Sequence, residues 1–379
     1  MLSIQNSKLL HFLLAPDKFK GSIDSISLCN ILRKEIVSFY PDAEVSSFPL
    51  ADGGDGFAQI IKYYFQTEEV EVPTVDPLGR SIHASYQLTA DLTTAFIEMA
   101  SASGLAILAV QERDVMHASS YGTGILIKDA ILKGAKKIIL GIGGSATNDG
   151  GVGMAEALGY QFFDHSKNRI QPTAALMTSI DCILKPTDNM LERVEFIVAS
   201  DVKNPLLGPT GASHVYGPQK GASVEDIQIL ELGLTHLNTL FQQELGISVA
   251  DHEGAGAAGG MGAGCMAFLN AKLISGVEFI VHEIGLEDVL SKADFIISGE
   301  GGVDEQSISG KVVGYIAHLA TKYNKKIHLI CGDSSLSEEK LKSIGVEKIR
   351  ALVSFSSSRE DAIKNPEKYI PLALQSLFN

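Results

Sequence analysis

The chain has little positive charge and no long apolar run. Its 31 Lys and Arg against 45 Asp and Glu give a formal net charge of −14 at pH 7 over 379 residues. Phosphate backbones are bound by clustered Lys and Arg. No such cluster occurs, so we expect no nucleic-acid partner. A membrane span needs roughly 18 or more consecutive apolar residues, and no stretch approaches that length, so we expect no membrane partner.

Cysteine is also scarce. The four cysteines stand far apart with no CxxC pair, which excludes zinc-ribbon and thioredoxin-like sites. So few thiols in so long a chain favour a reducing compartment. The first apolar segment, residues 9–15, is short for a secretory signal and is broken by His11. These features predict a cytoplasmic protein. The absence of HExxH and GxSxG motifs also excludes zincins and α/β-hydrolases.

Both ends of the chain carry the pattern of a parallel sheet. The apolar run from His11 to Ala15 is typical of a strand buried on both faces, and a helix with Ser22 as its N-cap is expected to follow. The same alternation of strand and helix returns from Asp294 onward. Two strands alone rarely form a stable sheet, so we expect the two ends to combine into one doubly wound domain. The strands are predicted at 11–15, 44–48, 295–298, 327–331 and 349–353.

The middle of the chain has a different pattern. Residues 70–75 and 82–88 alternate between apolar and polar around the turn signal at 76–79, which predicts an antiparallel pair. Helices are expected at 224–243, capped by Ser223, and at 261–273. The predicted organisation is therefore a discontinuous domain of residues 1–70 plus 290–379, and an inserted α/β domain with a mixed sheet at 71–289.

Many of the 37 glycines fall in four clusters. Glycine costs chain entropy on folding, so its concentration in loops indicates places where the backbone approaches something closely. Ligands of open α/β sheets lie beyond the carboxyl ends of the strands. Because several of these loops follow predicted strands, we expect them to face one cleft.

The segment GIGGSATNDGG, residues 141–151, is the most suggestive loop. Exposed backbone N–H groups and small hydroxyl side chains suit phosphate. The candidates for contact with nucleotide phosphates are Gly143, Gly144, Ser145, Thr147 and Asn148. The loop also fits a loose dinucleotide fingerprint, with Asp164 as the ribose acid, so an NAD(P)-dependent oxidoreductase is the rival interpretation. Residues 148–153 are poor helix material, however, whereas a dinucleotide-binding turn runs directly into a helix.

Two further loops offer ionic groups near the N-terminus. Lys18 and Lys20 precede an expected helix start at Ser22, where cations repel the helix dipole unless an anion is bound. We therefore predict substrate binding by these three residues. In ADGGDG, residues 51–56, Asp52 and Asp55 can hold Mg²⁺ through carboxylate oxygens. Asp55 can equally cap the following helix.

The remaining acid–base candidates follow later strands. Glu300, Asp304 and Lys311 lie in GEGGVDEQSISGK at 299–311. This is not a Walker A loop, because the required glycine is replaced by Glu305 and the residue after the lysine is Val312. Asp201 follows the apolar run 196–199, where a general base can sit; an Asx-turn is the alternative for it.

Six segments together resemble the type I glycerate kinase family, in the family's order and over nearly the whole chain. They are APDKFKGS at 15–22, ADGGDG at 51–56, GIGGSATNDGG at 141–151, SDVKNPLLGPTGA at 200–212, GAAGGMGAG at 256–264 and ISGEGGVDEQSISGK at 297–311. The resemblance implies a flavodoxin-like domain with an inserted α/β domain. It also implies phosphorylation of D-glycerate by ATP with Mg²⁺, giving 2-phospho-D-glycerate or the 3-phospho isomer.

A kinase needs an anion cradle, a divalent metal and a base, and the candidates above fill these roles. Asp201 is the expected base, with Glu300 and Asp304 as competitors, and Lys311 neutralises charge in the transition state. Three positions depart from the family pattern: Asp55, Lys203 and Gly302. A non-catalytic hydroxy-acid-binding protein is a second alternative. The sequence leaves the oligomeric state open, a homo-oligomer included.

Overall fold

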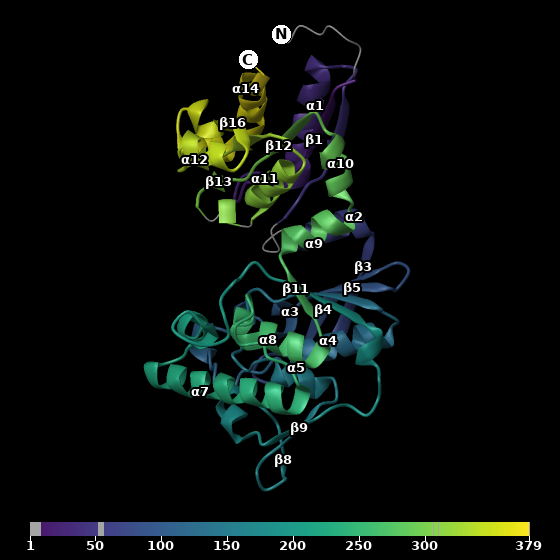
Figure 1. Ribbon diagram of the computed structural model, residues 1–379, viewed down its shortest axis with the longest axis vertical. Helices are drawn as coiled ribbons and strands as arrows, with labels where there is room; N and C mark the ends of the chain where they lie inside the picture. The colour runs from purple at the N-terminus through teal and green to yellow at the C-terminus, as the bar shows by residue number, and fades with distance from the viewer. Residues whose placement is uncertain (1–8, 52–56, 306, 310, 379) are drawn as a thin grey trace. The chain divides into compact units, whose positions relative to one another are not determined.

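The computed structural model describes residues 9–51, 57–305, 307–309 and 311–378. The chain divides into two compact units (Figure 1). The first unit comprises Met1–Ile60 together with Ser275–Asn379, and the second comprises Ile61–Ile274. Both ends of the chain thus belong to the same unit, and the second unit is inserted between them. In the part of the chain that the structure describes, no helix combines the length and the apolar character needed to cross a bilayer.

The first unit is built on a five-stranded, fully parallel sheet in the order β16-β14-β12-β1-β2. Counted along the chain this order is 2-1-3-4-5, that of flavodoxin-like folds, so the predicted fold class is confirmed. Figure 1 shows purple N-terminal and green-to-yellow C-terminal elements side by side in this unit. The strands are β1 (His11–Leu14), β2 (Glu44–Ser47), β12 (Phe295–Ser298), β14 (Ile327–Cys331) and β16 (Val346–Ala351).

Apolar side chains hold this sheet between its helices. The ring of Phe12 on β1 is fully buried and stacks on Phe295 of β12 at 5.0 Å between centroids. Residues from both chain ends share one core, in which Leu32 and Ile36 join Leu374. Parallel strands covered on both faces are expected to be apolar throughout, and β14 is buried along its whole length. The helices are α1 (Ser25–Phe39), α9 (Gly276–Glu283), α10 (Leu286–Lys292), α11 (Val312–Lys322), α12 (Glu338–Ser343), α13 (Arg359–Lys364) and α14 (Pro366–Phe378).

The predicted N-cap of the first helix is wrong. Helix α1 is capped by Asp24, whose carboxylate accepts hydrogen bonds from the backbone N–H and the hydroxyl of Ser27. Aspartate and serine are similarly good caps, so the choice depends on what else each side chain contacts. The Ser22 hydroxyl donates instead to the carbonyl oxygen of Ile363 at 2.6 Å and ties the first loop to α13.

The second unit contains a mixed sheet of six strands in the order β11-β10-β6-β5-β4-β3. Strands β3, β4 and β5 pair antiparallel, and the remaining pairs are parallel. Asp76 forms the predicted turn between β3 and β4, because its carboxylate accepts from the backbone N–H groups of Leu78 and Arg80. The strands are β3 (Thr67–Val75), β4 (Ser81–Thr89), β5 (Thr94–Glu98), β6 (Lys137–Gly141), β10 (Glu195–Ala199) and β11 (Lys272–Ile274).

Two long helices of this unit test the sequence patterns. Helix α7 (Val224–Leu240) has Ser223 as its N-cap in a capping box with Asp226, as the pattern predicts. Helix α8 (Ala257–Leu269) begins and ends four residues before the predicted limits. Asn270 ends α8 in the left-handed region, at φ 53°.

The second unit also contains the helices α4 (Tyr121–Leu132) and α5 (Val152–Ala157). A small sheet contains β7 (Gln161–Phe163), β8 (Arg169–Ile170) and β9 (Cys182–Leu184).

Candidate functional site

Loops at the carboxyl edge of the first unit's sheet are hydrogen-bonded to one another. The Asp17 N–H donates to the Gly299 carbonyl at 2.8 Å, which joins the loops after β1 and β12. The Asp333 N–H donates to the Gly301 carbonyl at 3.1 Å, which joins the loops after β12 and β14. A Cβ at residue 299 would collide with the Ile330 carbonyl oxygen. Glycine therefore permits the close approach that brings the three loops together.

These loops and α13 enclose a pocket of about 500 Å³. Its wall carries four cationic side chains, Lys18, Lys20, Lys311 and Arg359, and three carboxylates, Asp17, Glu300 and Asp333. A concave surface lined by several cations concentrates anions, so the pocket suits a small anionic ligand despite the negative net charge of the chain.

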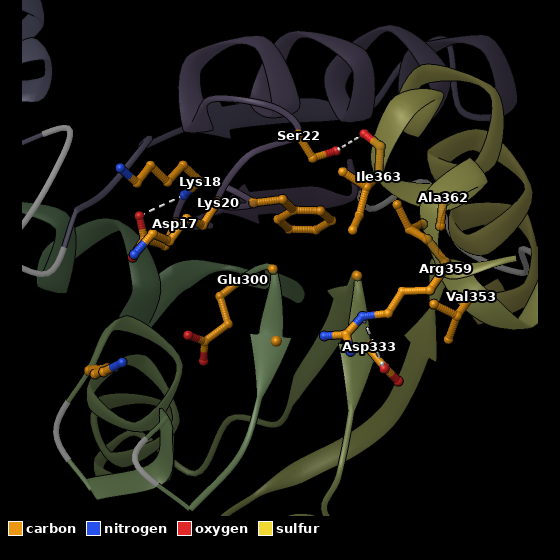
Figure 2. Close-up of a pocket in the computed structure, with 16 residues that line it drawn as sticks. Asp17, Lys18, Lys20, Ser22, Glu300, Asp333, Val353, Arg359, Ala362 and Ile363 are labelled. Atoms are coloured by element: carbon orange, nitrogen blue, oxygen red, sulfur yellow. Dashed lines mark hydrogen bonds and ion pairs between the residues drawn. The ribbon is translucent and has the colours of Figure 1, made fainter.

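Figure 2 shows the arrangement of the ionic groups. Asp17, Lys18 and Lys20 come from the loop after β1, and Arg359 reaches the pocket from the first residue of α13. The Arg359 Nε lies 3.9 Å from an oxygen of Asp333. Glu300 lies between the loop after β1 on one side and the pair of Arg359 and Asp333 on the other, and it is only 8% exposed. The pocket thus combines anion-binding groups with a carboxylate that is sheltered from water.

Five residues singled out from the sequence line this pocket: Lys18, Lys20, Ser22, Glu300 and Lys311.

Three other candidates are placed differently. Asp304 is exposed and is not part of the pocket wall. Its carboxylate accepts from the backbone N–H of Ser307 at 3.0 Å, which is a capping contact. Asp52 and Asp55 lie outside the described residues.

Sequence reasoning missed Arg359 and Asp333. Asp333 follows the strand β14, separated from it only by Gly332. Because ligands of parallel sheets bind beyond the carboxyl ends of strands, this position could have been predicted as a candidate. Arg359 starts a short helix after the N-cap Ser358. Nothing local in the sequence distinguishes it from a solvated surface arginine.

In the second unit, the loop 141–151 exposes only its tip. Gly143 and Gly144 are exposed, and a Cβ at Gly143 would meet no atom within 4 Å. The tip is anchored on both sides, by a hydrogen bond from the Leu105 N–H to the Gly144 carbonyl and by one from the Ala146 N–H to the Ser103 carbonyl. The backbone of the tip is therefore held in place and accessible to a ligand.

The rest of this loop faces inward. Ser145 is 5% exposed, and Thr147, Asn148 and Asp149 are fully buried. The Asn148 amide donates to the Ser213 hydroxyl at 3.3 Å. The predicted contact of Ser145, Thr147 and Asn148 with phosphate stays a prediction, and it requires these side chains to become accessible when a ligand binds.

Behind the loop lies Lys220, a buried lysine that sequence reasoning did not single out. Its ammonium is within hydrogen-bonding distance of the Ser145 hydroxyl oxygen, at 2.8 Å, and of the Thr147 carbonyl oxygen, at 2.6 Å. Burial lowers the pKa of Lys220 to about 7, and the charge of Asp149 partly offsets this effect. Burial likewise raises the pKa of Asp149, against hydrogen bonds from Ser120, Gly151 and Gly153 that lower it.

The glycine cluster at 254–264 packs against the same loop. Gly259 has φ +72°, and a Cβ there would overlap the Thr147 carbonyl oxygen and lie 2.6 Å from the Asn148 Cα. A Cβ at Gly264 would overlap the Gly150 carbonyl oxygen. These glycines therefore serve close packing. The expectation that all the glycine-rich loops face one cleft stays a prediction.

The features of a dinucleotide site are missing from this loop. Helix α5 begins only at Val152, after Gly150 and Gly151, both with positive φ. Asp164, the proposed ribose acid, is half-buried, and its carboxylate accepts from the backbone and side-chain N–H groups of Asn168. These observations remove the structural basis for the oxidoreductase interpretation.

Asp201 and Lys203 follow β10 in the second unit, and both are exposed. The Lys203 ammonium, at one of the departures from the family pattern, lies 3.8 Å from a carboxylate oxygen of Glu253. Gly302, a second departure, lines the pocket of the first unit, and a Cβ there would meet no atom within 4 Å. Among the described residues, no cluster of three or more His, Cys, Asp or Glu could hold a metal ion.

Comparisons with known proteins agree over nearly the full length. A sequence model described as the glycerate kinase family matches residues 12–379. The chain is 39% identical over 356 residues to the glycerate 2-kinase of Escherichia coli, covering 94% of this chain and 93% of that one. It is 38% identical over 365 residues to the glycerate kinase of Halalkalibacterium halodurans, covering 96% of each.

A solved structure shares the fold. The crystal structure of a candidate glycerate kinase 2 from Salmonella typhimurium LT2 superposes with a TM-score of 0.84 at 36% identity. The match covers 98% of this chain and 99% of that chain.

Proposed function

Because the chain belongs to the glycerate kinase family and is a phosphotransferase of that family, we propose that it transfers a phosphoryl group from ATP to D-glycerate. We propose 2-phospho-D-glycerate as the product, and the name of the Escherichia coli relative, glycerate 2-kinase, supports this choice. The four free thiols suit a reducing compartment, which supports a cytoplasmic location.

The pocket of the first unit carries this proposal. Glycerate is a small anion whose hydroxyl groups become nucleophiles only when a proton is removed. Lys18 and Lys20 on one wall suit the glycerate carboxylate, and Lys311 suits the charge that develops on the transferred phosphoryl group. Catalysis by a kinase consists mainly of positioning the substrates and stabilising charge. A cavity that contains both cations and an acid sheltered from water can do both.

Two acids compete for the role of general base. Glu300 lies in the pocket wall beside the proposed carboxylate-binding lysines. Asp201 follows β10 in the second unit and is exposed, and it acts as the base only if glycerate binds within its reach. Asp304 is the weakest candidate, because its carboxylate caps the turn at Ser307.

The nucleotide is assigned to the loop at 141–151 and the metal to the segment at 51–56. The exposed Gly143–Gly144 tip suits phosphate oxygens, since backbone N–H groups can point at an anion. Mg²⁺ commonly uses one or two carboxylates plus substrate phosphates, so a preformed cluster of protein ligands is not required. Asp52 and Asp55 would hold the ion, which would neutralise charge on the ATP phosphates.

A coupled ADP-release assay over a panel of small hydroxy acids, with and without Mg²⁺, tests the proposal. We expect ADP release that depends on D-glycerate and on Mg²⁺, and ³¹P NMR of the product distinguishes the 2- from the 3-phosphate. Glycerate binding without ADP release would instead identify a non-catalytic hydroxy-acid-binding protein.

Lys20→Ala tests the substrate pocket. Loss of one cation should raise the KM for glycerate about tenfold or more while the KM for ATP changes little, because the contact is made in the ground state. Lys34→Ala, an exposed lysine on α1 outside the pocket, is the matched control. Unchanged kinetics of Lys20→Ala would rule this contact out.

A further inference from the structure

Lys220 joins two points of the glycine-rich loop of the second unit. Its side chain is 2% exposed, and its Nζ donates to the Ser145 hydroxyl at 2.8 Å and to the Thr147 carbonyl at 2.6 Å. These acceptors lie on either side of Ala146. One buried ammonium therefore holds the loop at two positions close to its exposed tip.

The turn that carries Lys220 is itself fixed by close contacts. Lys220 ends the short 3₁₀-helix Pro218–Lys220, and Gly221 follows with φ +97°. A Cβ at Gly221 would lie 2.7 Å from the Arg113 carbonyl oxygen, so only glycine fits easily. The Arg113 guanidinium donates to the Gln219 carbonyl at 3.1 Å. These contacts fix the turn, and the turn fixes the position of the Lys220 side chain against the loop at 141–151.

The charge of Lys220 is costly in this position. A buried ammonium loses its hydration, and a partner charge offsets this loss only in part. Asp149 supplies negative charge nearby, but its own carboxylate already accepts hydrogen bonds from Ser120, Gly151 and Gly153. A methionine would fill similar space without the cost of desolvating a charge. The presence of a buried cation here therefore points to a role beyond packing.

The exposed tip lies directly before the residue that Lys220 holds. Gly144 is adjacent to Ser145, and both Gly143 and Gly144 are exposed. Consecutive backbone N–H groups in such a turn form a concave anion site when their geometry is held fixed. A positive charge behind the site strengthens it, because charges act over longer distances where water is excluded.

We propose that Lys220 is a positioning residue for nucleotide binding. It fixes Ser145 and Thr147 so that the Gly143–Gly144 tip presents its N–H groups to the phosphates of ATP, and its charge attracts them. This inference rests on the proposed function, in which the loop at 141–151 binds the nucleotide.

Lys220→Met tests the inference, with Lys128→Met, an exposed lysine on α4 of the same unit, as the matched control. The Kd of ATP is measured by calorimetry with and without Mg²⁺, and the KM values for ATP and glycerate are measured separately. We expect Lys220→Met to raise the Kd and KM for ATP about tenfold, equivalent to ~1.4 kcal/mol. The KM for glycerate should stay within twofold of wild type, and Lys128→Met should change neither constant.

A folded Lys220→Met variant that binds ATP within twofold of wild type overturns the proposal. So does an equal rise in both KM values, because a merely structural role would weaken both sites together. If Lys220→Met does not fold, Lys220→Gln replaces it, since this variant removes the charge but keeps a side-chain N–H donor and leaves Ser145 and Thr147 unchanged. A rise of threefold or more in the ATP Kd then supports the proposal, and an unchanged Kd overturns it.

The same measurements separate this inference from the proposed function. If the wild-type protein binds ATP but phosphorylates no glycerate, the proposed function fails, and the comparison of ATP Kd values still tests Lys220. If the wild-type protein binds no ATP, both fail.

Discussion

Asp149→Asn should weaken the second unit more than any conservative substitution of an exposed carboxylate. One Asp149 oxygen accepts from the Ser120 N–H and the Ser120 hydroxyl, each at 2.8 Å, and from the Gly153 N–H at 3.3 Å. The other accepts from the Gly151 N–H at 3.2 Å. An asparagine can turn its oxygen toward the first three donors, but its NH₂ group then faces the Gly151 N–H.

The expected loss follows from these four contacts. A hydrogen bond to a charged group contributes about 1.5–3 kcal/mol, and one between neutral groups about 0.5–1.5 kcal/mol. Three bonds lose their charge, at ~1 kcal/mol each, and the fourth, worth at least ~1.5 kcal/mol, is replaced by two opposed donors, so the free energy of unfolding should fall by about 4 kcal/mol or more. The loss of the negative charge beside Lys220 adds little, because its lowered pKa, about 7, lets the lysine release its proton.

Urea unfolding at pH 6.5, followed by far-UV circular dichroism, measures this loss. Hydrogen exchange of peptides covering 141–153 reports on the second unit separately. Asp251→Asn, at an exposed position in the same unit, is the matched control and should leave the midpoint near that of wild type. A loss below about 1 kcal/mol for Asp149→Asn would refute the prediction that the hydrogen bonds of Asp149 stabilise the second unit.

A double-mutant cycle with Lys220→Met then tests the charge pair. The double variant should lose less stability than the sum of the single variants, by up to ~1 kcal/mol, because Lys220→Met leaves the Asp149 carboxylate without its partner and Asp149→Asn leaves the lysines still protonated at pH 6.5 without theirs. Strictly additive losses would show that the two charges do not interact.

Three further predictions concern packing, chemistry and pH. Gly259→Ala should lower the free energy of unfolding by more than ~3 kcal/mol or prevent folding, because its methyl group would overlap the Thr147 carbonyl oxygen. Gly246→Ala, at a similar φ in open space, should lower it by only about 1–2 kcal/mol. Thermal unfolding compares the two variants, and equal losses would contradict the steric argument. Asp201→Asn should lower kcat by about 10²-fold or more if Asp201 is the base, and a near-normal kcat would transfer that role to Glu300. The pKa of Lys220 is about 7 in the folded chain and 10.5 in its ordinary state, so between pH 7 and 8.5 the unfolded chain keeps a proton that the folded chain releases. The free energy of unfolding of wild type should therefore rise by roughly 1.5 kcal/mol relative to that of Lys220→Met over this range. Urea midpoints of the two proteins that change in parallel with pH would contradict this.

The strands and the polar loops beyond them were predictable from the sequence. Buried parallel strands are apolar throughout, so β1, β12 and β14 stand out as short apolar runs. Parallel strands place the loops after their carboxyl ends along one edge, so Lys18 and Glu300 could be assigned to one site before any coordinates were known.

Local signals were ambiguous where two residues could fill the same role. Ser22 and Asp24 are both good N-caps, and the contact of the Ser22 hydroxyl with Ile363 joins positions far apart in the chain. Helix α8 begins earlier than its apolar pattern suggests, at Ala257, and includes a kink at the residues that pack against Thr147. Tertiary contact decided both cases, because local propensities differ by less than a single packed contact contributes.

The loop at 141–151 shows the same division between sequence and structure. Its glycines and small polar residues predict close backbone approach and anion binding. The same letters do not reveal that only Gly143 and Gly144 reach the surface while Asp149 is fully buried. Lys220 stands 75 residues from Ser145, and in the sequence it looks like any surface lysine. The periodicity of the sequence shows which face of a strand or helix is apolar. A hydrogen bond between residues far apart in the chain leaves no local pattern, because its donor and acceptor come together only when the chain folds.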